Sequence, residues 1–233
     1  MDWQENLRND FGVDSRGIEL FELLLRLLVE RSDRNLTAVT SPLKIVDFHF
    51  RDSLSLLSFP ELTGASNAVD VGSGAGFPGL PLAICMPGLN VSLLESNRQK
   101  SDFIQIFIDL SGLANASVIP LRAESAGSGS CRDHYDLALA RAVGPLPTTM
   151  EYASPLVREG GSVLLQRGEV LAGERDAAES AGSALALKLA RVEPVKPYAS
   201  ARNLHVWVFK KVSATPSRFP RKPGMARKRP LGG

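Results

Sequence analysis

The stretch "VDVGSGAGFPGLP", residues 69–81, constrains the fold of this chain of 233 residues more than any other segment. A short apolar run comes first, four glycines follow within eight positions, and helix-compatible sequence comes after them. Glycine lets the backbone turn through left-handed conformations and brings bare main chain close to a ligand. The segment therefore predicts a strand, a ligand-binding loop and a helix, which together open an α/β sheet.

The rest of the chain continues this alternation of short β-rich runs and helical stretches. Strands are expected at 68–71, 90–96, 117–121, 135–141 and 162–166. Helices are expected over 79–86 and 98–113, and the closely spaced runs 189–195 and 205–212 suit an antiparallel pair of strands. The pattern predicts a doubly wound, mostly parallel sheet of seven strands, with ligands at the carboxyl ends of the strands.

The first 64 residues are expected to form a small helical region ahead of the sheet. Ser15 can cap a helix that runs to about residue 33, and a second helix begins at Ser41 with Pro42 in its first turn. We therefore divide the chain into a helical region (1–64), a sheet domain (65–213) and a basic, proline-rich tail (214–233).

Composition excludes several classes of protein. Apolar residues make up 44% of the chain and charged residues 22%, as in ordinary soluble globular proteins. No apolar run approaches the roughly 20 residues that cross a bilayer. The acidic, polar start "MDWQENLRND" is unlike a secretory signal, so a cytoplasmic protein without membrane contact is expected. Cys85 and Cys131 are too few for a disulfide framework or a zinc site, and no metal is expected.

Charge is distributed unevenly along the chain. The last 40 residues contain ten Lys or Arg and no acidic residue, whereas the preceding part has 17 Lys or Arg against 25 Asp or Glu. A basic end on an acidic body suggests an anionic polymer such as nucleic acid as partner, although it is also typical of a solvated tail.

The frame of the glycines bears on the identity of the ligand. A G-x-G-x-x-G pattern exists at Gly74, Gly76 and Gly79, but Gly72 and Ser73 separate it from the strand. When the pattern is counted from the strand, the third glycine of a dinucleotide-binding motif falls on Phe77. Asp70 followed by G-x-G-x-G instead resembles the first motif of methyltransferases that use S-adenosyl-L-methionine (AdoMet).

Glu95 ends the second expected strand, 23 residues after Gly72. A carboxylate there can accept both ribose hydroxyls of a nucleoside. That spacing suits either cofactor, so an NAD(P)-dependent oxidoreductase remains an alternative at this point.

Longer segments resemble one family closely. "DVGSGAGFPGLPLAI" looks like the signature of the bacterial small-subunit rRNA guanine-N7 methyltransferases, the glucose-inhibited division protein B family. "NLTAV", "HFRDSL", "LLESNRQKSDFI", "LARAV" and "RFPRKPGMARKRPL" resemble other parts of the same family in the same order. The resemblance covers roughly residue 35 to the C-terminus. Three positions depart from the family's usual residues, with Glu95 for Asp, Arg167 for Lys and Ala140 for Ser.

The resemblance implies an AdoMet-dependent enzyme that methylates N7 of a guanine in 16S rRNA. The residues expected to bind or arrange the cofactor are Asp70, Gly72, Gly74, Gly76, Phe77, Glu95, Ala123, Glu124 and Arg141. Guanine N7 carries a lone pair and no proton, and AdoMet is already activated, so no general base is required. Alignment of the reactants and exclusion of water should supply most of the rate. Arg141 and His49 are the candidates for direct roles at the cofactor or the target base.

Basic side chains are expected to contact RNA phosphates and to position the substrate without reading its sequence. The candidates are Lys100, Arg167, Arg218, Arg221, Lys222, Arg227, Lys228 and Arg229. Prolines in the tail are expected to keep it extended so that it wraps around RNA, and deleting residues 216–233 is expected to spare AdoMet binding. The partner is 16S rRNA or the small ribosomal subunit, and the protein is expected to be a monomer. A non-enzymatic RNA-binding protein and a small-molecule methyltransferase are the remaining alternatives.

Overall fold

A computed structural model describes residues 2–232, apart from the side chain of Asp33. Its centre is a sheet in the order β3-β2-β1-β4-β5-β7-β6. Strands β1 to β5 are parallel, and β7 runs antiparallel to both of its neighbours. The strands are β1 (Asn67–Val71), β2 (Asn90–Leu94), β3 (Ala116–Ile119), β4 (Tyr135–Arg141), β5 (Val157–Arg167), β6 (Leu187–Val195) and β7 (Leu204–Lys211). The expected doubly wound sheet with an antiparallel finish is therefore confirmed.

The helices before the sheet are α1 (Trp3–Phe11), α2 (Ser15–Glu30), η1 (Ser32–Arg34), α3 (Pro42–Ile45), η2 (Val46–Arg51), α4 (Asp52–Leu54), η3 (Ser55–Ser58) and α5 (Pro60–Thr63). Those that follow β1 are α6 (Gly79–Cys85), α7 (Arg98–Ser111), α8 (Ala123–Ser128), α9 (Leu146–Ala153), η4 (Ser154–Leu156), α10 (Glu174–Leu185) and α11 (Met225–Lys228).

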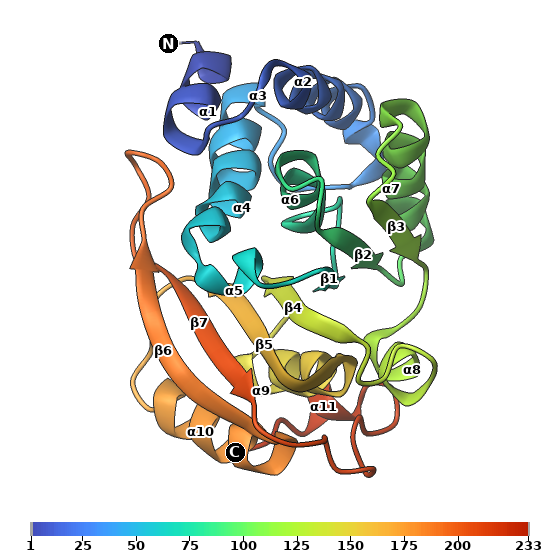
Figure 1. The fold of residues 1–233 in the computed structure, drawn as a ribbon, viewed down its shortest axis with the longest axis vertical. Helices are drawn as coiled ribbons and strands as arrows, with labels where there is room; N and C mark the ends of the chain where they lie inside the picture. The colour runs from blue at the N-terminus through green and yellow to red at the C-terminus, as the bar shows by residue number, and fades with distance from the viewer. Residues whose placement is uncertain (1, 233) are drawn as a thin grey trace.

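The helices form layers on the two faces of the sheet (Figure 1). Alternate side chains of each strand point to opposite faces, so neighbours such as Leu139 and Ala140 on β4 belong to different hydrophobic clusters. One cluster joins the sheet to α2, α6, α7 and the N-terminal helices, and the other joins it to α8, α9 and α10. Burial on both faces explains why the strands read as nearly continuous apolar runs.

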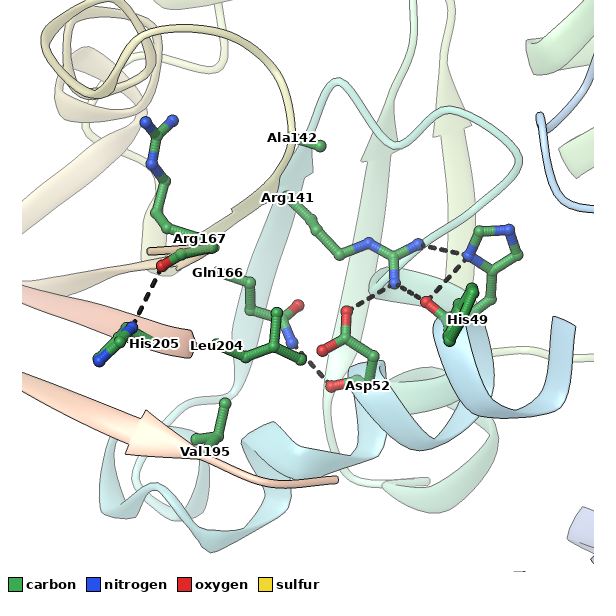
Figure 2. A pocket seen from close by; sticks show the side chains of 11 residues that line it. His49, Asp52, Arg141, Ala142, Gln166, Arg167, Val195, Leu204 and His205 are labelled. Atoms are coloured by element: carbon green, nitrogen blue, oxygen red, sulfur yellow. Dashed lines mark hydrogen bonds and ion pairs between the residues drawn. The ribbon is translucent and has the colours of Figure 1, made fainter. Parts of the chain in front are cut away.

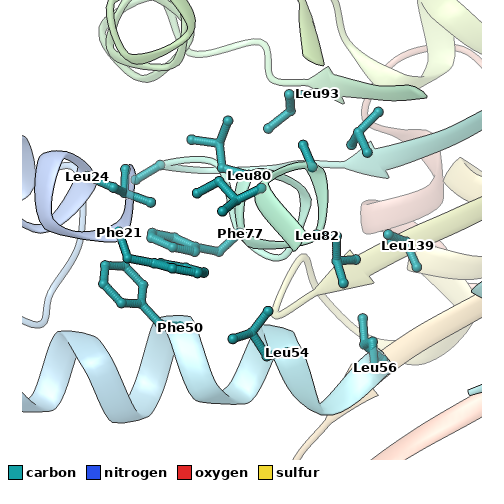
Figure 3. Close-up of a cluster of buried hydrophobic side chains, with 14 of the residues drawn as sticks. Phe21, Leu24, Phe50, Leu54, Leu56, Phe77, Leu80, Leu82, Leu93 and Leu139 are labelled. Atoms are coloured by element: carbon teal, nitrogen blue, oxygen red, sulfur yellow. The ribbon is translucent and has the colours of Figure 1, made fainter. Parts of the chain in front are cut away.

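The N-terminal helices pack on the first of these layers through aromatic side chains. Phe50 lies 4.9 Å from Phe21 and 6.1 Å from Phe77, measured between ring centroids, and all three are buried (Figure 3). This contact ties α2 and the π-turn η2 to the glycine loop. The helical region is thus packed against the sheet domain.

Two details of this region differ from expectation. Asp14, not Ser15, caps α2, because its carboxylate accepts the Gly17 N–H at 2.7 Å. The second helix does begin after Ser41, but it changes winding over its length, from α to the wider π-turn η2 and back. The π-turn holds His49, and such turns are frequent at functional sites.

The C-terminal segment, residues 214–232, is not the extended arm that the prolines suggested. Phe219 and Ala226 are buried, and the Arg132 guanidinium donates to the carbonyls of Thr215 and Phe219. Thr148 on α9 donates to the Ala226 carbonyl at 3.0 Å. Apolar side chains between the basic ones allow the segment to pack, so it forms part of the domain surface. Within residues 2–232, no helix is long and apolar enough to cross a membrane.

Candidate active site

The glycine loop after β1 is held in a left-handed conformation that suits glycine. Gly72 has φ of 69° and Gly74 has φ of 60°. The amide of Gly72 donates to the Leu94 carbonyl at 2.8 Å, which ties the loop to the end of β2. A Cβ on Gly72 would lie 3.0 Å from Val143, whereas the corresponding space beside Gly74 is open. The loop therefore brings bare main chain to the point where β1, β2 and β4 end.

Asp70 lies behind this loop and fixes its shape. Its Oδ2 accepts the Gly79 N–H at 2.8 Å, at the start of α6, while Oδ1 is buried without a hydrogen-bond partner among residues 2–232. Burial raises the pKa of Asp70 to about 7. A pyrophosphate bound at the start of this helix would need donors, and a carboxylate already takes the Gly79 amide. The geometry therefore disfavours a dinucleotide.

Close packing explains the other glycines of the segment. A Cβ on Gly76 would lie 2.3 Å from Leu80, and one on Gly79 would lie 2.9 Å from Asp70 Oδ2. Gly76 and Gly79 are thus required where the loop packs against Leu80 and Asp70.

A cavity of about 130 Å³ opens in front of the loop, at the carboxyl ends of β1, β2 and β4. Its lining residues are Val71, Gly72, Leu94, Glu95, Ser96, Leu121, Arg122, Ala123, Glu124, Val143 and Tyr152. We call it the cofactor cavity. It brings together four residues expected from the sequence, Gly72, Glu95, Ala123 and Glu124.

The two carboxylates of the cofactor cavity are held in place by main-chain amides. Glu95 accepts the Gly74 N–H at 2.9 Å and the Asn97 N–H at 2.7 Å. Glu124 accepts the N–H of Gly224, from the C-terminal segment, at 2.8 Å. Carboxylates beside apolar walls suit the hydroxyls and the flat base of a nucleoside. The glycine main chain leaves room for the group attached to the nucleoside. The lining of this cavity therefore suits the nucleoside end of AdoMet.

A second cavity, of about 360 Å³, lies beyond the ends of β4 and β5 and is closed by η2 (Figure 2). Phe48, His49, Asp52, Arg141, Ala142, Gln166, Arg167, Gly168, Val195, Leu204 and His205 line it. We call it the substrate cavity. Ala142 borders this cavity and the next residue, Val143, borders the cofactor cavity, so the loop after β4 contributes to both.

Arg141 organises the substrate cavity. Its Nη1 donates to Asp52 Oδ2 at 2.9 Å and to the Phe48 carbonyl at 2.8 Å, and its Nη2 lies 3.1 Å from His49 Nδ1 (Figure 2). The guanidinium also lies over the Phe77 ring, 5.4 Å from its centroid. The His49 ring stacks on the same Phe77 ring at 4.7 Å. The structure thus brings together Arg141, His49 and Phe77, which were all expected at the site.

The charge state of the cluster follows from its burial. Burial, together with the nearby Arg141 cation, lowers the pKa of His49 to about 4, so the ring is neutral at physiological pH. Thr37 lies 2.7 Å from its Nε2 and helps to fix the ring. Burial raises the pKa of Asp52 from its ordinary value, and the Arg141 cation acts against that rise.

Asp52 and Gln166 were missed as site residues. Asp52 lies three residues after His49 in "HFRDSL", and that helical spacing places both on one face. Gln166 precedes Arg167 at the end of β5, the edge where ligands were expected. Both signals were present in the sequence.

The candidates for RNA contact divide into two groups. Lys100, in the first turn of α7, and Arg218, Lys222, Arg227, Lys228 and Arg229 form no ion pair among residues 2–232. Arg221 and Arg167 are committed elsewhere. Arg221 pairs with buried Glu151 on α9, and Arg167 pairs with Glu174 at 3.0 Å and donates to the Gly144 carbonyl.

The fold, the glycine loop and the cofactor cavity together define an AdoMet-dependent methyltransferase. Solved structures share this fold, among them a variant of MtNAS in complex with S-adenosylmethionine, with a TM-score of 0.55, 16% identity and coverage of 91% of this chain and 84% of that one. M. jannaschii TYW2 in complex with AdoMet matches with a TM-score of 0.50 and 20% identity, over 63% of this chain and 69% of that one.

The family model described as rRNA small subunit methyltransferase G matches residues 18–204. Similar proteins include ribosomal RNA small subunit methyltransferase G of Carboxydothermus hydrogenoformans, 37% identical and covering 95% of this chain and 96% of the relative. The protein of the same name from Deinococcus radiodurans is 38% identical and covers 96% of this chain and 89% of the relative. The chain belongs to the rRNA small subunit methyltransferase G family, which confirms the family, the cofactor and the enzyme class that were expected.

Proposed function

We propose that this methyltransferase transfers a methyl group from AdoMet to N7 of one guanine in 16S rRNA. The observation that carries the proposal is that two consecutive residues of the loop after β4, Ala142 and Val143, line the two cavities. One cavity fits a nucleoside cofactor, and the other is large enough for an unstacked base and is lined by an aromatic ring, an arginine and a carboxylate. Sequence-specific RNA recognition generally targets such splayed bases.

The residues of the cofactor cavity would hold AdoMet, which supplies an activated methyl group when bound. Glu95 would accept hydrogen bonds from the ribose hydroxyls, and the main chain from Gly72 to Gly74 would face the amino-acid end. Phe77 supports the site from behind, through its contacts with His49 and Arg141. Asp70 keeps the loop in shape.

The residues of the substrate cavity would align and desolvate the guanine. N7 attacks through its lone pair, so no side chain has to remove a proton. His49, with its pKa of about 4, is neutral and would add no second positive charge beside Arg141. Arg141 would donate to the base and fix its orientation. Alignment of this kind supplies much of the rate of such a reaction.

The protein would act as a monomer, because one chain supplies both cavities. It would act in the cytoplasm, where its rRNA substrate is found. Exposed Lys222, Arg227 and Lys228 on the C-terminal segment would contact phosphates beside the target loop. Arg221 and Arg167 would support RNA binding indirectly, because Arg221 fixes the C-terminal segment to Glu151 and Arg167 is paired with Glu174.

The direct test is to incubate the protein with AdoMet and small ribosomal subunits from a strain that lacks the modification. Chemical cleavage at 7-methylguanine should then identify one position in 16S rRNA. Incorporation of label without any 7-methylguanine would contradict the proposal.

The cofactor placement has its own test in Gly72→Val. The new side chain would meet Val143 at about the 3.0 Å already reached by a Cβ, and it would enter the cavity. Binding of S-adenosylhomocysteine, measured by calorimetry, should be lost. Gly112→Val is the matched control, because Gly112 has φ of 67° and open space around it but lies at the end of α7. Equal losses in both variants would mean that backbone strain, and not the cavity, is responsible.

A further inference from the structure

Gln166 presents a hydrogen-bond acceptor that no group among residues 2–232 satisfies. The residue is 5% exposed, and its Nε2 donates to the Asp52 main-chain carbonyl at 2.7 Å. That bond fixes the orientation of the amide, and Oε1 is left buried without a donor among residues 2–232. A buried acceptor without a partner is costly, and such groups in native proteins call for an explanation.

Asp52 presents a second free acceptor in the same wall of the substrate cavity. Its Oδ2 is held by Arg141, whereas Oδ1 has no donor among the residues that the structure describes. The side chain is 13% exposed, so the carboxylate is screened from bulk water but still borders the cavity. Figure 2 shows Gln166 and Asp52 pointing toward one another, with the Arg141 guanidinium beside them.

Two neighbouring acceptors and one cationic donor select among the nucleobases. Guanine carries N1–H and the N2 amino group side by side, next to the O6 acceptor. Adenine and cytosine place an acceptor nitrogen beside their amino group, and uracil places N3–H between two acceptors. Only guanine offers two adjacent donors followed by an acceptor, and carboxylates are natural acceptors for such amino and imino groups.

We propose that Asp52 Oδ1 and Gln166 Oε1 accept the N1–H and N2 amino hydrogens of the target guanine, with Arg141 donating to O6. This inference rests on the proposed function and assigns the residues that make its substrate a guanine. Held by its Watson–Crick edge, the base leaves N7, on the neighbouring Hoogsteen edge beside O6, with a lone pair that is free for the methyl group. Asp52 and Gln166 are thus specificity-determining residues.

The experiment replaces the target guanine by inosine, which lacks only the N2 amino group and keeps N7. Small subunits are reconstituted with 16S rRNA that carries either base at the mapped position, and methyl transfer is measured in single turnovers. For the wild-type protein, we expect inosine to lower the rate at subsaturating substrate about tenfold or more, because one donor to this pair of screened acceptors is lost.

Two variants test whether this loss comes from the named residues. Asp52→Asn and Gln166→Met should both react more slowly with guanine, and for each the penalty for inosine should shrink to about threefold or less. A purely structural role would lower both rates equally and leave the penalty intact. Asp47→Asn is the matched control, since this carboxylate lies on the same helical stretch but is 43% exposed and pairs with Arg51. It should keep the full wild-type penalty.

The outcomes are distinguishable. Equal wild-type rates on guanine and inosine, or a full penalty in both variants, would overturn this inference and leave the proposed function standing. Absence of 7-methylguanine even with the natural base would overturn the proposed function and this inference together. If Asp52→Asn fails to bind S-adenosylhomocysteine or to unfold cooperatively, Gln166→Met decides the question.

Discussion

Two arginine–carboxylate pairs join distant parts of this molecule, and they serve different ends. Arg141 and Asp52 lie 2.9 Å apart at the substrate cavity, and Arg221 and Glu151 join the C-terminal segment to α9. Asp52 keeps 13% of its side chain exposed, and Glu151 keeps none. The first pair borders a cavity and leaves Asp52 Oδ1 without a donor among the residues that the structure describes, whereas Arg221 binds both carboxylate oxygens of Glu151.

The difference separates a pair that is available to a ligand from a pair that is committed to the fold. Glu151 also accepts the Arg221 main-chain N–H at 3.0 Å, and Arg221 donates in turn to the Arg229 carbonyl. A carboxylate so fully bonded has little capacity left for RNA or cofactor. At least one basic residue of the C-terminal segment, Arg221, therefore serves as an internal anchor.

The largest expected effect is on the stability of the C-terminal anchor. Arg221→Ala leaves Glu151 buried without a partner, and we expect a loss of about 3–5 kcal/mol in the free energy of unfolding. Urea denaturation measures this loss. Replacing both residues by Leu should recover much of it, since no uncompensated charge remains. An undiminished midpoint in Arg221→Ala would show that Glu151 does not need Arg221 as its partner.

The next largest effect is expected on the rate of methyl transfer when the Arg141–Asp52 pair is changed. Arg141→Lys keeps a positive charge beside Asp52 but loses the forked contact with the Phe48 carbonyl and His49. We expect single-turnover methylation to fall about 100-fold with little change in thermal stability. Arg158→Lys is the control, because Arg158 pairs with Asp136 at the amino ends of β4 and β5, away from both cavities, and is 52% exposed. Similar losses of activity in the two variants would contradict the assignment of Arg141 to the site.

The pH dependence of stability reports on His49, which lies beside the Arg141–Asp52 pair. The pKa of this ring is about 4 in the folded protein and 6.5 when unperturbed, so the unfolded chain binds more protons between these values. Stability due to His49 is therefore complete above pH 6.5 and is lost as the pH falls toward 4. Asp70 acts in the opposite direction, because its raised pKa of about 7 removes stability as the pH rises from 3.8.

The variant His49→Gln separates these two opposing contributions. Relative to the variant, the wild-type protein should gain on the order of 2 kcal/mol in the free energy of unfolding between pH 4.5 and 6.5. Denaturant titrations at several pH values measure the difference. A difference that is independent of pH would mean that His49 is solvated like an ordinary surface histidine.

The smallest effects are expected from exposed charges on the C-terminal segment. Lys222→Gln or Lys228→Gln should each weaken RNA binding slightly and lower the slope of log K against log salt by about 0.7–0.9. Neither should change the unfolding midpoint, in contrast to Arg221→Ala. Arg26→Gln, on the exposed side of α2, removes one charge outside the expected RNA surface and should leave the slope unchanged. Equal slopes for all three variants would remove the segment from the RNA interface.

Much of the fold was predictable because its signals are local. The strands and the glycine loop follow from apolar runs and from backbone conformations that suit glycine, which neighbouring residues determine. Helix α1 was missed because its short polar sequence carries a weak pattern, although Asp2 caps it by accepting the Gln4 N–H. The π-turn at His49 depends on the packing of Phe50 against Phe21 and Phe77, which no local pattern reveals.

The site was predictable where spacing carries the chemistry and unpredictable where partners are distant. Gly72 and Glu95 were found by their positions at strand ends, and both border the cofactor cavity. Arg221 was expected to meet RNA because its partner Glu151 lies 70 residues earlier in the chain. Deletion of residues 216–233 was expected to spare AdoMet binding. It is now expected to disturb the cofactor cavity, because the Gly224 N–H holds Glu124 in the wall of that cavity.

The place of β7 in the sheet affects how the protein is made. This strand lies between β5 and β6, which do not pair with one another. While the chain is being synthesised, β5 and β6 therefore each expose an unpaired edge until residues 204–211 have been made. Such edges favour aggregation. The nascent protein thus completes its sheet only after β7 has been made, and a message truncated before residue 204 yields a product without a finished core.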